Sequence, residues 1–323
     1  MAVHRDPITF ATWNPYVPKD MLGRDPARLR LEGRGTVYRP AGPGPHAGVV
    51  VAQGLGGPSE VREHAYGRWL AEHGYVALVI DSFASRGVRT RSDALRALRL
   101  TTAMILADGF AALRHLAADP AVDPARIGIV GFSYGGMVAI LTAYRKLHEL
   151  FLPNGPSFAT HVSLYGCSVP RLSDVATTGA PLLVLCGRRD GNVSLDRTRA
   201  IVGDLEAGGS RVRFEILDVY HQWDGADRER RWLPFHVRQC RIRLNDELAL
   251  VDEGGGGEID GFWNRVLFLL RNTSFRGYFI QRDEDALARS NRLVLEALAA
   301  ARAGPLAVAP EAGAARARET SDA

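Results

Sequence analysis

The sequence predicts an α/β fold with a mostly parallel central sheet and helices on both faces. Short apolar runs alternate along the chain with longer segments of helical periodicity. Strands that alternate with helices pair in parallel through crossover connections. The chain has 323 residues and is 46% hydrophobic, which is enough for one large core.

The predicted strands are short apolar or alternating runs, most of them followed by a glycine-rich or polar loop. In chain order they are 37–39, 48–52, 75–80, 127–130, 160–165, 181–186 and 211–217. Two further runs, 237–244 and 247–251, flank an Asn-Asp pair and predict a β-hairpin.

The predicted helices follow capping residues or glycine turns, and several end at a glycine. They are 59–73, ended by Gly74, one long helix over 91–118, 137–147, 195–207 and 283–301. The helix over 195–207 has Ser194 as its N-cap and Gly208 as its end.

The remaining segments define the domain organisation. Residues 1–30 are interpreted as an N-terminal extension and 31–301 as one α/β domain. Within that domain, 222–282 is an irregular insertion that contains the hairpin. The segment 302–323 is rich in Ala, Gly, Pro and charged residues, a composition typical of a disordered tail.

The most informative motif is a glycine-flanked serine between a predicted strand and a predicted helix. Residues 131–135 read Gly-Phe-Ser-Tyr-Gly, which fits the G-x-S-x-G nucleophile elbow. The glycines leave room where a Cβ would collide with neighbouring strands and helices, because the turn at the serine is very tight. The pattern makes Ser133 a candidate nucleophile.

An elbow serine needs an acid and then a histidine, each in a loop after a later strand. Asp190 follows the strand 181–186 and His221 follows the strand 211–217. The order Ser133, Asp190, His221 predicts a triad in which the imidazole deprotonates the hydroxyl and the carboxylate orients the imidazole. Asp218 is a weaker candidate for the acid, since it lies only three residues before His221.

Backbone donors for an oxyanion are expected from two loops. One is the residue after the nucleophile, Tyr134, and the other is Leu55 in the glycine-rich loop that follows strand 48–52. The same loop lacks the lysine of a phosphate-binding P-loop and the spacing of a dinucleotide fingerprint, so a nucleotide site is not favoured.

These motifs resemble the α/β-hydrolase superfamily and, within it, the dienelactone hydrolase-like family. Besides the triad positions, the resemblance depends on the loop at 53–57, the segment 81–87 and the approach to the elbow at 116–127, and it covers roughly residues 30 to 225. It implies triad roles for Ser133, Asp190 and His221 and backbone-donor roles for Leu55 and Tyr134. Two positions depart from the family: a serine stands where dienelactone hydrolase has a cysteine, and Gln53 replaces a histidine.

The function expected from these residues is hydrolysis of a small or medium carboxylic ester or thioester through an acyl-enzyme. An acyltransferase or a peptidase could use the same triad, and an inactive hydrolase-fold binding protein is the alternative of a different class. Arg86, in a loop at the carboxyl edge of the sheet, is a candidate for binding a substrate carboxylate, although a structural role is favoured over that one.

Composition limits the partners. The formal charge of +4 arises from interspersed residues and does not indicate a nucleic-acid surface. The cysteines Cys167, Cys186 and Cys240 have no metal-binding spacing and are expected to be free thiols. No signal peptide or membrane-length apolar run is visible, so a cytoplasmic enzyme with no metal, no cofactor and no membrane partner is expected. The sequence leaves the oligomeric state open.

Overall fold

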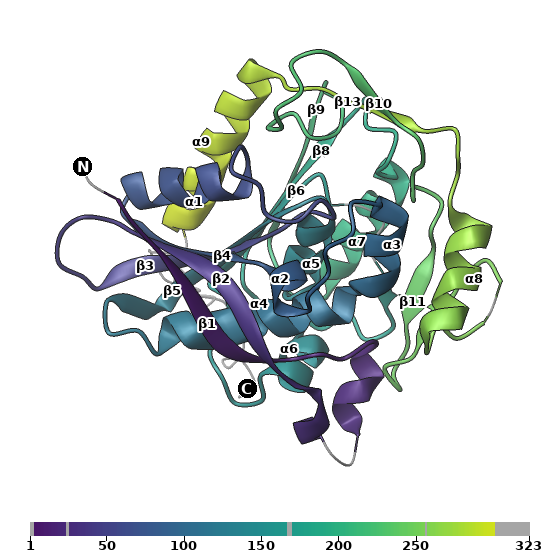
Figure 1. Ribbon diagram of the computed structural model, residues 1–323, viewed down its shortest axis with the longest axis horizontal. Coiled ribbons are helices and arrows are strands. Elements are labelled where there is room, and N and C mark those ends of the chain that lie inside the picture. The colour runs from purple at the N-terminus through teal and green to yellow at the C-terminus, as the bar shows by residue number, and fades with distance from the viewer. Residues whose placement is uncertain (1–2, 24–25, 167–169, 256, 301–323) are drawn as a thin grey trace, which may run out of the picture.

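An eight-stranded sheet runs through the centre of the molecule, with helices on both faces (Figure 1). The computed structural model describes residues 3–23, 26–166, 170–255 and 257–300. The strand order is β1-β2-β4-β3-β5-β6-β8-β9. In chain order the strands are β1 His4–Trp13, β2 Arg30–Arg39, β3 His46–Ala52, β4 Tyr75–Ile80, β5 Val122–Phe132, β6 Thr160–Leu164, β8 Leu182–Gly187 and β9 Val212–Leu217.

The pairing confirms the predicted mostly parallel α/β architecture. From β4 to β9 every neighbouring pair of strands is parallel, whereas β1 and β2 form an antiparallel pair at one edge. The carboxyl ends of the parallel strands therefore lie at one edge of the sheet, where open α/β folds bind ligands.

Two hydrophobic clusters bury the two faces of the sheet. On one face the sheet packs against α4 Thr102–Ala117, α5 Tyr134–Leu141, α6 Arg145–Phe151 and α7 Leu195–Ala207. On the other face it packs against α1 Glu63–Glu72 and α9 Glu284–Ala300. Successive residues of the central strands alternate between the two clusters, as the period of two in a strand requires.

The single helix predicted over 91–118 is two helices. α3 Asp93–Arg99 and α4 are separated by Leu100, whose backbone is extended, with φ −113° and ψ 109°. The hydroxyl of Thr101 then accepts a hydrogen bond from the N–H of Met104 and caps α4. The apolar pattern is continuous across this break, because Leu100 between the two helices is itself buried in the core. The pattern therefore did not reveal where the first helix ends.

Other helix boundaries also differ from the predictions. α1 begins at Glu63 rather than after Ser59, and it ends just before Gly74, whose φ is +84°. The helix predicted over 137–147 is divided into α5 and α6, with α5 starting directly after the serine. α7 has the predicted bounds, and the hydroxyl of Ser194 caps it by accepting the N–H of Arg197.

The N-terminal residues add a strand that the sequence analysis did not predict. β1 pairs with β2 along ten residues and forms the edge of the sheet, and the short 3₁₀ helices η1 Pro18–Leu22 and η2 Pro26–Leu29 connect the two strands. The tail predicted over 302–323 lies outside the described residues.

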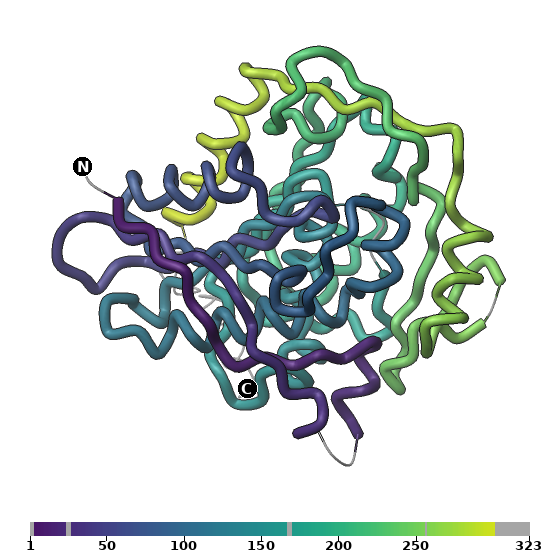
Figure 2. Tube along the Cα trace, in the orientation of Figure 1, coloured from purple at the N-terminus to yellow at the C-terminus, as the bar shows by residue number. Residues whose placement is uncertain are grey.

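The insertion after His221 forms a layer of its own along one side of the molecule (Figure 2). The predicted hairpin is present but short: β11 Ile242–Leu244 pairs with β12 Leu250–Asp252, and β7 Arg171–Leu172 joins it in parallel. β10 Arg231–Leu233 pairs with β13 Tyr278–Ile280. α8 Phe262–Asn272, which was not predicted, lies on the outside of this layer (Figure 1).

Candidate active site

The predicted elbow has the geometry that its glycines imply. Ser133 lies between β5 and α5 with φ 50° and ψ −107°, a backbone conformation that side-chain-bearing residues rarely adopt. A Cβ at Gly131 would lie 2.0 Å from the carbonyl oxygen of Gly135, and a Cβ at Gly135 would lie 2.2 Å from that of Ala52. Both positions therefore require glycine.

The structure brings Ser133, His221 and Asp190 together. His221 Nε2 is 3.0 Å from Ser133 Oγ, and His221 Nδ1 is 2.5 Å from Asp190 Oδ2. All three residues are buried. Their catalytic roles stay predictions, but the contacts are those that an activated serine requires.

Asp190 is held in place by the loop that carries it. Its Oδ1 accepts the backbone N–H groups of Asn192 (2.8 Å) and Val193 (3.2 Å), so that Oδ2 faces the imidazole. The weaker candidate Asp218 lies on the surface, where Arg189 Nε donates to it at 3.0 Å. It therefore does not compete for the histidine.

The two predicted backbone donors lie beside the serine. Leu55 and Tyr134 line the same cavity as Ser133. Tyr134 is the first residue of α5, so its N–H is one of the amides that have no acceptor within the helix. Gln53, at the position of the family histidine, accepts the N–H of Ser82 with its Oε1 at 3.1 Å, which braces the glycine-rich loop against the loop after β4.

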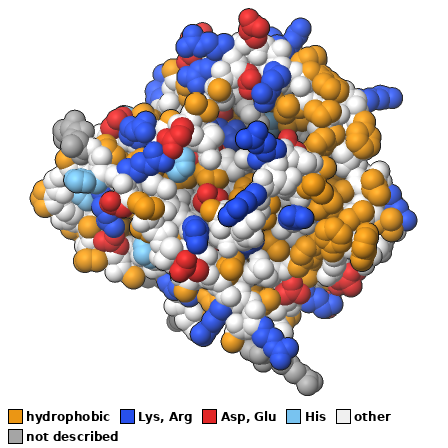
Figure 3. Space-filling view, viewed as in Figure 1, with side chains coloured by type: hydrophobic (Ala, Val, Ile, Leu, Met, Phe, Trp, Pro, Cys, Tyr) orange, Lys and Arg blue, Asp and Glu red, His pale blue; other side chains and the backbone are white. Residues whose placement is uncertain are grey.

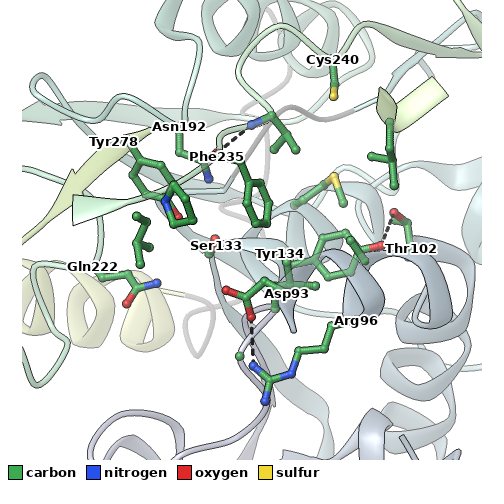
Figure 4. A pocket seen from close by; sticks show the side chains of 18 of the residues that line it. Asp93, Arg96, Thr102, Ser133, Tyr134, Asn192, Gln222, Phe235, Cys240 and Tyr278 are labelled. Atoms are coloured by element: carbon green, nitrogen blue, oxygen red, sulfur yellow. Dashed lines mark hydrogen bonds and ion pairs between the residues drawn. The ribbon is translucent and has the colours of Figure 1, made fainter. Parts of the chain in front are cut away.

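A cavity of about 300 Å³ opens above Ser133 (Figure 4). Asn192, Gln222 and Tyr278 lie on one side of it, and Tyr134, Thr102 and Arg96 lie on the other. The inserted layer closes the cavity from above with mostly apolar side chains, which are Leu233, Pro234, Phe235, Val237, Ile242, Phe268 and Leu269.

Arg265 of α8 is a cavity residue that the sequence analysis missed. Its Nε donates to the carbonyl of Ala97 at 2.8 Å, and its Nη2 donates to the hydroxyl of Tyr134 at 3.2 Å. The signal that could have identified it is a cationic residue within a largely apolar segment. Residues 262–268 read Phe-Trp-Asn-Arg-Val-Leu-Phe.

A buried polar cluster lies behind His221 and was also missed. The ring of Tyr165 packs edge-on against His221 with centroids 4.8 Å apart, and its hydroxyl donates to Asp224. Burial raises the pKa of Asp224 and also the pKa of Tyr165. Arg62 and Glu63 form a buried ion pair of 2.7 Å nearby, and although burial opposes ionisation, Arg62 holds the pKa of Glu63 below its usual value.

Three of the five non-glycine residues with positive φ among the described residues belong to this region. They are Ser133 (50°), Tyr165 (43°) and Gln222 (57°). Ser133 and Tyr165 each directly follow a strand, and Gln222 directly follows His221. The strained backbone is therefore concentrated around the candidate site.

The contacts of Arg86 fit the structural role that the sequence favoured, and its candidacy for binding a substrate carboxylate is corrected. It forms a buried bidentate pair with Asp108, at 2.6 and 3.1 Å, and its remaining N–H groups meet Asn14 Oδ1 and backbone carbonyls. The guanidinium thus ties the loop after β4 to α4 and β1, and no N–H is left for a ligand.

The remaining candidate chemistry is limited. Cys186 and Cys240 are buried free thiols, as expected, and burial raises the pKa of each to about 12; Cys167 lies outside the described residues. Among the described side chains, no three His, Cys, Asp or Glu residues are grouped in a way that could hold a metal ion. No helix in the described part of the chain has the length and apolar character needed to cross a membrane.

Comparisons with known proteins point to one family. The sequence model of the dienelactone hydrolase family matches residues 34–231. A dienelactone hydrolase-like promiscuous phosphotriesterase, P91, from metagenomic libraries is similar in structure, with a TM-score of 0.50, 20% identity, and coverage of 69% of this chain and 85% of that one.

Two further solved structures are similar at lower scores. A putative dienelactone hydrolase from Klebsiella pneumoniae has a TM-score of 0.48 and 22% identity, and the match covers 68% of this chain and 88% of that one. Esterase 2 from Thermogutta terrifontis, with propionate bound, has a TM-score of 0.47 and 18% identity, with 60% and 81% covered. No curated protein matches this sequence.

Proposed function

This chain belongs to the dienelactone hydrolase family, and we propose that it hydrolyses a small or medium carboxylic ester or thioester through an acyl-enzyme on Ser133. The observation that carries the proposal is the position of His221, whose two ring nitrogens lie within hydrogen-bond distance of Ser133 Oγ and Asp190 Oδ2. Membership of the family supports a hydrolase. The catalytic triad and the carboxylic ester substrate are what we propose in addition.

In the first half-reaction Ser133 Oγ attacks the ester carbonyl. With the Nδ1–H of His221 donating to Asp190, Nε2 is free to accept the serine proton, and Asp190 stabilises the imidazolium that forms. The carbonyl oxygen becomes an oxyanion that the N–H groups of Leu55 and Tyr134 stabilise. The imidazolium then protonates the departing alcohol or thiol, which leaves the acyl group on Ser133.

In the second half-reaction His221 deprotonates a water molecule that attacks the acyl carbonyl. The tetrahedral intermediate uses the same two amides, and its collapse returns the proton to Ser133 Oγ and releases the carboxylic acid. A backbone amide is already oriented before the reaction, so its stabilisation of the oxyanion requires no reorganisation.

The cavity supports the size of substrate. Its volume of about 300 Å³ and its mainly apolar lining fit an acyl or alcohol group of moderate length. An acyltransferase or a peptidase differs only in the acceptor or the leaving group, and no contact of the described residues favours either one over hydrolysis.

The test is hydrolysis of p-nitrophenyl esters of increasing acyl length, together with labelling by a fluorophosphonate. Wild-type protein should turn over a short ester and should be labelled once per chain at Ser133. Ser133→Ala should lose about 10⁴-fold or more of kcat/KM and all labelling.

A matched control separates chemistry from folding. Ser163 on the neighbouring strand β6 is buried and its hydroxyl has no hydrogen-bond partner among the described residues, so Ser163→Ala should keep both activity and labelling. A well-folded wild-type protein that neither turns over any ester nor reacts with the probe would contradict the proposal and favour an inactive binding protein.

A further inference from the structure

The layer over the cavity exposes an unusual amount of apolar surface. Ten large hydrophobic side chains are exposed among the described residues, and seven of them lie in two segments, 230–243 and 261–281, which we call the covering layer. The seven are Trp232, Phe262, Trp263, Leu267, Leu270, Phe275 and Phe279. They gather over α8 and extend toward β10 and β13 on the right of the space-filling view (Figure 3).

The covering layer is apolar on both of its sides. Along α8, Trp263, Leu267 and Leu270 follow the spacing of one helical face and point to solvent, with Trp263 78% exposed and Leu270 66% exposed. Phe268 and Leu269, on the other side of the helix, line the cavity above Ser133. A helix whose outer side faces water is expected to be polar there, so α8 has the composition of an element that is covered from outside as well.

The charged residues within the two segments are all basic, although the exposed acids Glu229 and Asp260 directly precede them. The two segments together contain eight arginines and no aspartate or glutamate. Arg238, Arg271 and Arg276 are exposed, and no carboxylate in the described ranges lies within ion-pair distance of them. The apolar patch is therefore bordered by cationic side chains that are available to an anionic partner.

From these observations we propose that the covering layer docks on the surface of an anionic phospholipid bilayer. Tryptophan, phenylalanine and leucine on one side of a helix, next to arginines, are the composition of helices that lie in the lipid–water interface. The apolar side chains would enter the boundary between headgroups and acyl chains, and the arginines would contact lipid phosphates. A second copy of the chain fits this face less well, because two cationic layers would repel each other.

The surface also adjoins the cavity. In β13, Tyr278 lines the cavity whereas Phe279 is exposed; in β10, Leu233 lines it whereas Trp232 is exposed. Docking would thus place the roof of the cavity against the lipid. The docking itself does not rest on the proposed ester hydrolysis, since binding can be measured with Ser133→Ala.

The experiment is cosedimentation of the full chain with sucrose-loaded vesicles. One set contains phosphatidylcholine and phosphatidylglycerol at a ratio of about 3:1, and the other contains phosphatidylcholine alone. We expect binding to the anionic vesicles that is at least about 25-fold tighter than binding to the neutral ones, because each arginine near an anionic surface contributes about a five-fold factor.

Two pairs of variants test the contacts. Leu270→Ser should weaken binding, whereas Val61→Ser, which removes a side chain that is 56% exposed outside the covering layer, should not. Arg271→Gln/Arg276→Gln should weaken binding to anionic vesicles about 25-fold. Its control, Arg68→Gln/Arg292→Gln, lowers the formal charge equally from +4 to +2 but removes exposed arginines of α1 and α9.

Three outcomes would overturn the proposal. They are no sedimentation with anionic vesicles, equal binding to neutral and anionic vesicles, and equal losses in the variants and their controls. A dimer in analytical ultracentrifugation that Leu270→Ser dissociates, in the absence of vesicle binding, would assign the face to a second copy instead.

Discussion

The hydroxyl of Tyr165 is predicted to contribute to the stability of the fold, and a second tyrosine provides the comparison. Tyr165 donates a hydrogen bond to Asp224, a buried carboxyl whose other oxygen has no hydrogen-bond partner within the described residues. Tyr66 belongs to the same hydrophobic cluster and is also buried, but its hydroxyl has no hydrogen-bond partner there. Replacing each tyrosine by phenylalanine keeps the ring and removes only the oxygen.

The two substitutions should have opposite effects on the free energy of unfolding. Tyr165→Phe leaves a carboxyl without its donor in the protein interior, and a buried polar group that loses its partner costs about 1 to 3 kcal/mol. Tyr66→Phe removes a hydroxyl that was buried without compensation, so the free energy of unfolding should stay the same or rise by up to about 1 kcal/mol. The expected difference between the variants is therefore about 2 kcal/mol.

Urea unfolding followed by circular dichroism measures this difference. The slope m should be equal in wild type and both variants, because neither substitution changes the surface exposed on unfolding. Thermal midpoints should differ by about 3 to 4 °C. Equal stabilities of the two variants would refute the assignment of the Tyr165 hydroxyl as the donor that compensates buried Asp224.

Two other substitutions test the elbow and the interior. Gly131→Ala should prevent the elbow from forming and abolish fluorophosphonate labelling, because its Cβ would lie 2.0 Å from the carbonyl oxygen of Gly135; the control Gly203→Ala, in α7 with nothing within 4 Å, should keep labelling and raise stability by about 0.5 to 1 kcal/mol. His161 is buried, and burial lowers its pKa to about 3. As the pH falls below 6.5, the histidine becomes protonated in the unfolded chain but stays neutral in the folded protein, so the free energy of unfolding decreases. Between pH 7 and pH 5 the wild type should lose about 2 kcal/mol more of its free energy of unfolding than His161→Leu; equal losses in urea titrations would contradict the neutral, buried histidine.

The sheet and the candidate triad could be predicted because their signals are local. Each central strand is a short apolar run, and the spacing of the glycines around Ser133 follows from sterics within five residues. Asp190 and His221 could be located from chain order, because the carboxyl ends of parallel strands meet at one edge of the sheet. What the sequence could not supply was the distance between their side chains.

The errors have non-local causes. The helix over 91–118 is interrupted because the hydroxyl of Thr101 competes with the helix as a cap, and the apolar pattern does not report that competition. The structural role favoured for Arg86 agrees with its contacts, but its acceptors could not be named from the sequence, because they come from β1, α4 and the segments beside them. Strand β1 went unpredicted because its residues are largely exposed at the edge of the sheet, where an alternating pattern is weak.

The covering layer escaped prediction for a reason that also links it to the site. The pattern of α8 does not report which side faces the core, because its apolar stripe with Trp263, Leu267 and Leu270 faces solvent while Phe268 and Leu269 line the cavity. Arg265 of α8 donates to the carbonyl of Ala97 and to the hydroxyl of Tyr134, which itself donates to the carbonyl of Leu100. Since the backbone N–H of Tyr134 is a proposed oxyanion donor, any displacement of α8 at a lipid surface would act on the residue next to the nucleophile. Arg265 is thus one contact between the covering layer and the residue that follows Ser133.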